Sequence, residues 1–427
     1  MLADTYLDAM GSHWAGDSQS LNATLGLLRA GRETLLPLVQ PRQRRSAWLA
    51  RWRELAAKPP QPSAISDWLA AAEATVQGIA EAASYPALRR CVVALILQAW
   101  SAAGARWSQS DDAAAMRILL KLYSLHRSAA LRKSAVEYYH FSKSAGTSVC
   151  VASAVEGCTT YSTSEQFTCL MPAFVDGPRW ISRQAHEERC RIAMPDYGNC
   201  TKSIYSKLAK WGSRYPKGSL MVCRKRAKAL ELGGLNFYAS EYTLRGQGGV
   251  PGAPPALCGQ FLNFAVVSHL QFLVRLTHNW MGRRTAQYYD GMSLADWHAL
   301  LPGLLDNFYT RGLLGERVFY LPVGGLNASQ LLPAAQAALG AMDVLLVLEV
   351  EARSATDTHA EVEEIANQVL PSGAAAQELE QANSLDEQVY SFAVLMSRLD
   401  AVVWAAAEAA GEEPLKMPKS LPPQDGD

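Results

Sequence analysis

Small polar residues between two apolar segments form the stretch of this 427-residue chain best suited to chemistry. Residues 136–150 read VEYYHFSKSAGTSVC. The β-branched and aromatic first part predicts a buried strand, and the apolar pattern after Ser148 predicts a helix. A strand, a tight loop and a helix N-terminus in this order make an anion site, because backbone N–H groups and the positive end of the helix dipole meet there. Gly146 permits close approach, Lys143 supplies a positive charge, and Thr147 offers a hydroxyl, which favours phosphate as the ligand.

The order of the residues argues against an ordinary ATP-binding loop, which needs the pattern G-x-x-x-x-G-K-[ST] with the lysine after the last glycine. Here Lys143 precedes Gly146. The string HFSKSAGTS at residues 140–148 instead resembles the H-x-x-K-[TSA]-[GA]-G-T-S loop of Golgi-type carbohydrate sulfotransferases. It is most similar to the heparan-sulfate 2-O-sulfotransferase group and its unicellular-eukaryote relatives. In that family the loop holds the 5′-phosphosulfate of 3′-phosphoadenosine-5′-phosphosulfate (PAPS), and no metal is needed. The resemblance implies that this co-substrate is bound by Ser142, Lys143, Ser144, Ala145, Gly146, Thr147 and Ser148.

A second candidate follows a second predicted strand. Residues 235–244 read LNFYASEYTL, and Glu241 lies where open α/β sheets place ligands, at the carboxyl end of the strand. The resemblance implies a catalytic acid or histidine at this point. We therefore predict that Lys143 and Glu241 are catalytic, with Glu241 as the general base that takes the proton from an acceptor hydroxyl. The alternative is an acid at a strand end with no chemical role.

The third predicted strand, FLNFAVV at residues 261–267, runs directly into Ser268 and His269. Members of the resembled family place R-[DE]-P-x-x-R-x-x-S-H here, and the first arginine and the serine hold the 3′-phosphate of PAPS. This chain keeps Ser268 as the implied cofactor contact but has no arginine or proline before it. Weak recognition of the 3′-phosphate is therefore expected.

A fourth motif, DNFYTRGLLG at residues 306–315, resembles the N-[FY]-x-T-R-x-L-x-G element that lies near the substrate cleft of the same family. We predict that Arg311 contacts the substrate, with an ion pair that stabilises a helix as the alternative. A predicted helix at 331–342 and strand at 343–349 also match, so the resemblance spans about residues 134–400.

Composition and cysteines indicate the compartment. Lys+Arg 40 against Asp+Glu 40 leave no net charge, so no general attraction to nucleic acid is expected.

Six of the eight cysteines lie at residues 150–223 without C-x-x-C pairs, which favours disulfides over zinc, with scattered thiols as the alternative. Sequons stand at Asn22, Asn199 and Asn327. Neither a signal peptide nor an apolar run of membrane-spanning length is evident. These features predict the Golgi lumen or secretory pathway, with any membrane association through an anchor not visible in the chain.

Strands that alternate with helices predict an α/β, P-loop NTPase-like three-layer fold with a mainly parallel sheet. We expect a helical N-terminal region at 1–130, a sulfotransferase-like P-loop domain at 131–405 and a disordered tail at 406–427. The predicted function is transfer of a sulfuryl group from PAPS to a hydroxyl of a saccharide. Two alternatives stay open: a catalytically impaired relative that binds glycan or protein, and another P-loop enzyme of phosphoryl transfer.

Overall fold

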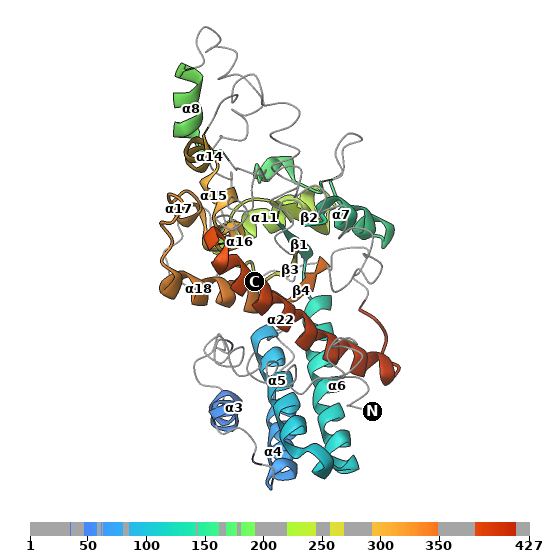
Figure 1. Ribbon diagram of the computed structural model, residues 1–427. Coiled ribbons are helices and arrows are strands. Elements are labelled where there is room, and N and C mark those ends of the chain that lie inside the picture. The colour runs from blue at the N-terminus through green and yellow to red at the C-terminus, as the bar shows by residue number, and fades with distance from the viewer. Residues whose placement is uncertain are drawn as a thin grey trace, which may run out of the picture.

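A computed structural model describes residues 35, 47–57, 61, 63–79, 85–141, 144–161, 168–176, 181–192, 220–244, 257–268, 293–348 and 381–415 (Figure 1). Its strands are β1 (Ala135–His140), β2 (Phe237–Ser240), β3 (Phe261–Val267) and β4 (Val344–Val347). Its helices are α3 (Ala47–Ala57), α4 (Ile65–Gln77), α5 (Pro86–Ala103), η3 (Gly104–Arg106), α6 (Gln109–Leu131), α7 (Gly146–Val155), η4 (Pro172–Phe174), α8 (Arg183–Ile192), α11 (Leu220–Leu232), α14 (Leu294–Leu300), α15 (Pro302–Leu305), α16 (Phe308–Leu314), α17 (Glu316–Phe319), α18 (Ala328–Gly340) and α22 (Ser384–Ala409).

The four strands form one parallel sheet in the order β2-β1-β3-β4, which confirms the predicted α/β class and parallel sheet. In the register, Tyr139 of β1 pairs with Ser240 of β2 on one side and with Ala265 of β3 on the other. The chain moves from β1 outward to β2 and then returns across β1 to β3. A topological switch point therefore lies at the carboxyl ends of β1 and β3, where doubly wound sheets bind ligands.

Apolar side chains cover both faces of this sheet. Tyr139, Ala265 and Leu345 share one face and pack into a core with α16, α18 and α22. Tyr138 lies on the other face, in a smaller core that includes Cys150 of α7. Burial on both faces explains why the strands read as continuous apolar runs rather than alternating ones.

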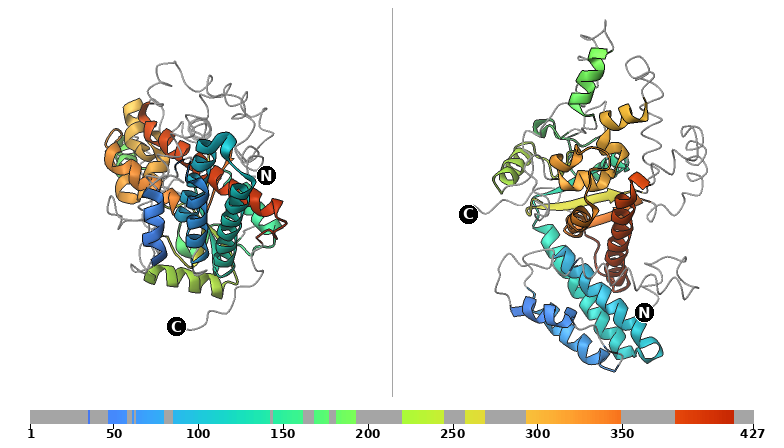
Figure 2. Two further views of the ribbon diagram at one scale, coloured as in Figure 1. Left: turned by 90° about the horizontal axis from the view of Figure 1, so that it is seen from below. Right: turned by 60° about the vertical axis from the view of Figure 1, so that its left-hand side comes forward.

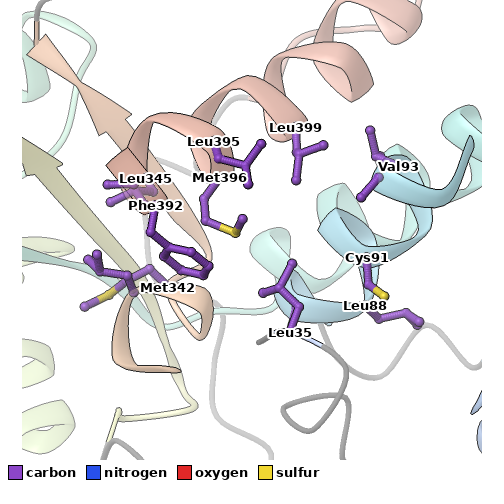
Figure 3. Close-up of a cluster of buried hydrophobic side chains, with 14 of the residues drawn as sticks. Leu35, Leu88, Cys91, Val93, Met342, Leu345, Phe392, Leu395, Met396 and Leu399 are labelled. Carbon is purple, nitrogen blue, oxygen red and sulfur yellow. The ribbon is translucent and has the colours of Figure 1, made fainter. Parts of the chain in front are cut away.

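The N-terminal helices pack beside the sheet domain through α22. In Figures 1 and 2, α4, α5 and α6 lie side by side, and α22 runs between them and β4. Figure 3 shows Phe392 beside Leu345 of β4 and Leu399 facing Val93 of α5. Among the described segments, α22 alone is long and apolar enough to cross a membrane, but most of its apolar stretch is buried in this core. It ends at Ala409, four residues beyond the predicted domain end at 405.

A buried charge cluster joins the same helices. Arg89 and Arg90 of α5 both contact Asp400 of α22, at 2.9 and 2.7 Å. Arg89 also donates to His126 Nδ1 of α6 at 2.8 Å, so this imidazole is neutral with Nδ1 unprotonated. Burial, followed by the charge of Arg89, lowers the pKa of His126 to about 2. The N-terminal helices and the sheet domain are thus joined by apolar packing and by paired charges.

Disulfides confirm the prediction for the cysteine-rich segment. Cys150 is bonded to Cys169, and Cys223 is bonded to Cys258, which lies outside that segment. Cys190 is also disulfide-bonded. Bonded pairs of this kind are consistent with an oxidising, secretory-type environment.

Candidate functional site at the carboxyl edge of the sheet

The strand–loop–helix unit predicted as an anion site is present where β1 leads into α7. β1 ends at His140 and α7 begins at Gly146, while Ser142 and Lys143 lie outside the described residues. Ala145, the N-cap residue, has a left-handed backbone with φ 57° and offers no side-chain acceptor to the helix. Thr147 and Ser148 in the first turn are exposed. The start of α7 therefore presents backbone N–H groups without a side-chain cap, which suits an anion.

Glu241 and His140 form a pair beside this helix terminus. The Glu241 Oε1 to His140 Nδ1 distance is 3.0 Å, and their side chains are only 10% and 8% exposed. A Cβ added at residue 146 would overlap the His140 ring, and Nε2 is the ring atom that it would meet first. Only glycine therefore lets the imidazole reach the first residue of α7. The pair thus extends from the end of β2 to the N-terminus of α7.

The backbone of Glu241 is held in place by a buried ion pair next to it. Its backbone N–H donates to the carbonyl of Asp176 at 3.1 Å. The Asp176 carboxylate in turn accepts two bonds from Arg226 of α11, at 2.5 and 3.0 Å, and both side chains are fully buried. A bidentate pair of this kind gives directional rigidity as well as energy.

A pocket opens beside the pair. It is a shallow recess, and the space of about 380 Å³ in and around it includes open solvent. Its described lining consists of Tyr139, His140, Phe141, Glu241, Tyr242, Thr243, Phe308, Gly312, Glu316, Phe319 and Tyr320. Aromatic rings, two carboxylates and one imidazole thus surround a space next to the predicted base.

Ser144 and Ser268, two predicted cofactor contacts, are brought together by Tyr309 of α16. The Tyr309 hydroxyl lies 3.2 Å from Ser144 Oγ and 2.8 Å from the carbonyl of Ser268, and it accepts from the Ser268 N–H at 3.1 Å. Ser144 is fully buried, and Ser268 is nearly so. The structure therefore places Ser144 beneath the loop, with its hydroxyl toward Tyr309, rather than on the exposed side with Thr147.

Arg311, predicted to contact the substrate, instead lies inside the fold. Its side chain is fully buried and pairs with Asp306 Oδ2 at 2.5 Å. The remaining guanidinium N–H groups donate to backbone carbonyls, namely those of Asp306, Val318, Phe319, Leu321 and Pro322. Arg311 thus holds the chain from α16 to the turn after α17, which fits the ion-pair alternative.

Sequence reasoning assigned no role to His140 or Tyr309. His140 was available as the last residue of the first strand, directly before the loop. Tyr309 could not be found in this way, because its contacts join segments about 40 and 165 residues away. Within the described ranges, no group of three or more His, Cys, Asp or Glu side chains is placed to hold a metal ion.

No family model, curated protein or solved structure matches this chain. The functional assignment therefore depends on the motif resemblance and on the geometry of the site.

Proposed function

We propose that this protein is a PAPS-dependent carbohydrate O-sulfotransferase with a P-loop-like nucleotide site. The observation that carries the proposal is the meeting of the Glu241–His140 pair with the N-terminus of α7 at the carboxyl edge of the sheet. An anion cradle and a proton acceptor lie side by side there, which is what transfer of a sulfuryl group to a hydroxyl requires.

In the proposed reaction the acceptor oxygen attacks the sulfur of PAPS and forms a new S–O bond. The bond from sulfur to the bridging phosphate oxygen breaks, and 3′-phosphoadenosine 5′-phosphate (PAP) leaves with the electron pair. The acceptor proton passes to the Glu241–His140 pair. Lys143 and the N–H groups at the start of α7 stabilise the charge that develops on the bridging oxygen.

The pocket suggests how an acceptor would bind. Tyr320 and Phe319 can pack against the apolar face of a sugar ring, while Glu241 and Glu316 can accept hydrogen bonds from sugar hydroxyls. None of the described lining residues is lysine or arginine. This lining favours a neutral sugar over a uronate at the position next to the base.

The proposed setting is the lumen of the secretory pathway, as for the Golgi enzymes that the loop resembles. The disulfides and the exposed sequon at Asn327 agree with that setting. Saccharide is the proposed partner.

A second candidate is a catalytically impaired relative that binds glycan or protein. β3 ends at Val267 and Ser268 follows immediately, with no arginine between them. Arg311 cannot replace that arginine, because its donors are occupied inside the fold. Losing one charge-assisted contact to the 3′-phosphate would weaken PAP binding roughly ten- to a hundredfold. Calorimetry with PAP and 5′-AMP separates the cases, since this relative would bind both weakly and with little difference.

The test of transfer uses the purified protein, PAPS and a panel of neutral and acidic glycans. We expect a product heavier by one sulfuryl group, together with stoichiometric PAP. Glu241→Gln should lower the rate while PAP affinity stays nearly unchanged, because the carboxylate acts on the acceptor. Full activity of Glu241→Gln would remove Glu241 from the mechanism. Absence of product on every glycan, with PAP bound no better than 5′-AMP, would favour the impaired relative.

A further inference from the structure

One buried hydroxyl joins the two segments that leave the carboxyl ends of β1 and β3. Tyr309 is 1% exposed, and its oxygen contacts both the carbonyl and the N–H of Ser268 and the Oγ of Ser144. These strands flank the switch point of the sheet. In the proposed site, the hydroxyl therefore lies between Ser144, near the 5′-phosphosulfate of the nucleotide, and Ser268, near its 3′-phosphate.

The donors and acceptors at this point can be assigned. A tyrosine hydroxyl has one hydrogen and two lone pairs. Its hydrogen goes to the Ser268 carbonyl at 2.8 Å, and one lone pair receives the Ser268 N–H at 3.1 Å. The contact with Ser144 at 3.2 Å then requires Ser144 Oγ to be the donor. All three bonding positions of the tyrosine oxygen are filled by protein groups, so it does not itself reach a ligand.

The loop after β1 is held from the opposite side as well. The Tyr138 hydroxyl donates to the Ser144 carbonyl at 2.9 Å. Ser144 is thus hydrogen-bonded through its backbone carbonyl to Tyr138 and through its side chain to Tyr309. The Tyr138 hydroxyl bonds to the β1 loop, whereas the Tyr309 hydroxyl connects that loop to Ser268 at the end of β3.

We propose that Tyr309 is a positioning residue that couples the two ends of the nucleotide site, so that order at Ser268 depends on order in the β1–α7 loop. This inference rests on the proposed function. A site held open at both ends avoids part of the ordering cost on binding. Loss of the hydroxyl should therefore weaken nucleotide binding more than it slows turnover of the bound complex.

The test compares Tyr309→Phe with Tyr123→Phe. Tyr123 of α6 is a matched control in the N-terminal helical layer. It is also a buried tyrosine, and its hydroxyl donates to one backbone carbonyl, that of Glu413. We expect Tyr309→Phe to raise the Kd for PAP about tenfold, and the KM for PAPS similarly, with kcat within about threefold. Tyr123→Phe should leave both unchanged.

Ser144→Ala removes the hydroxyl that bonds to Tyr309. It provides the test if Tyr309→Phe does not fold. It should weaken PAP binding by itself. Combined with Tyr309→Phe it should add almost nothing, because the two changes break the same link. Fully additive losses, or a Tyr309→Phe protein that binds PAP like the wild type, would overturn the inference while leaving the proposed function intact. A wild-type protein that binds no PAP would instead refute both.

Discussion

At the scale of single residues, the site depends on how closely His140 approaches the first turn of α7. The imidazole occupies the space that a side chain at residue 146 would need, and its Nδ1 faces Glu241. The glycine thus permits a close approach of two protein groups, in addition to any approach of a ligand. Its requirement here is steric, since its backbone φ is not among the positive ones.

Gly146→Ala is accordingly expected to displace the His140 ring and separate it from Glu241. Sulfuryl transfer should fall at least tenfold, and displacing the buried ring should lower the free energy of unfolding by about 1–3 kcal/mol. Gly78→Ala is the matched control, because the nearest atom to an added Cβ there is 3.5 Å away. Transfer rates and thermal unfolding of both variants provide the test. An unimpaired Gly146→Ala enzyme would show that the pair is not needed.

At the scale of elements, the sequence predicted the parts whose signals are local. The apolar runs predicted all four strands, and the polar break after His140 predicted the loop and the helix that follows. Glu241 could be selected because the end of a parallel strand is a defined place in such folds. Each of these inferences used neighbours along the chain.

The remaining features depend on contacts between distant segments. Arg311 was assigned to substrate because its motif gave a sequence position but no burial, and the carbonyls that it binds come from the turn after α17. The pairing of Cys223 with Cys258 was missed for a similar reason, since 35 residues separate them. Neither burial nor pairing of this kind follows from local periodicity.

The helical layer makes a pH-dependent contribution to stability through His126. Its pKa is about 2 in the folded protein and about 6.5 in the unfolded chain, so only the unfolded chain takes up a proton between these values. The contribution of His126 to the free energy of unfolding is greatest above about pH 6.5 and decreases as the pH falls. From about pH 7.5 to about pH 5 the loss should reach about 2 kcal/mol. His126→Asn keeps an acceptor for Arg89 but does not titrate, so its loss over this range should be smaller by that amount. Urea unfolding at the two pH values measures the difference, and equal losses in both proteins would contradict the assignment.

The Cys150–Cys169 disulfide ties α7 to the segment beside β2. It closes a loop over a separation of 19 residues, which predicts a stabilisation of about 3 kcal/mol, mainly through the unfolded chain. Cys150→Ala with Cys169→Ala should lower the free energy of unfolding by about that amount without reductant, and by much less with it. Cys91→Ala, at a buried thiol, is the control whose effect should not depend on reductant. A double variant as stable as the wild type without reductant would show that this bond is absent in solution.

At the scale of the whole molecule, the fold brings three separate segments to one edge of a parallel sheet. In the proposed reaction, the loop before α7 supplies the anion cradle and the end of β2 supplies the base, while Tyr309 of α16 bonds to Ser144 of that loop. Helix α22 anchors the N-terminal layer to the sheet. The arrangement explains why candidate site residues are spread over more than a hundred positions of the chain.

The most direct test of the proposed sulfuryl-transfer function is the rate of transfer from PAPS in the wild type and in Lys143→Ala. The sequence predicts a loop at Lys143, and a loop lysine contributes little to a core, so the variant should unfold at the same temperature as the wild type. Loss of one charge aimed at the transition state costs about 3–4 kcal/mol, so the rate should fall about a hundredfold to a thousandfold. A folded Lys143→Ala protein that transfers sulfuryl groups at the wild-type rate would contradict the account.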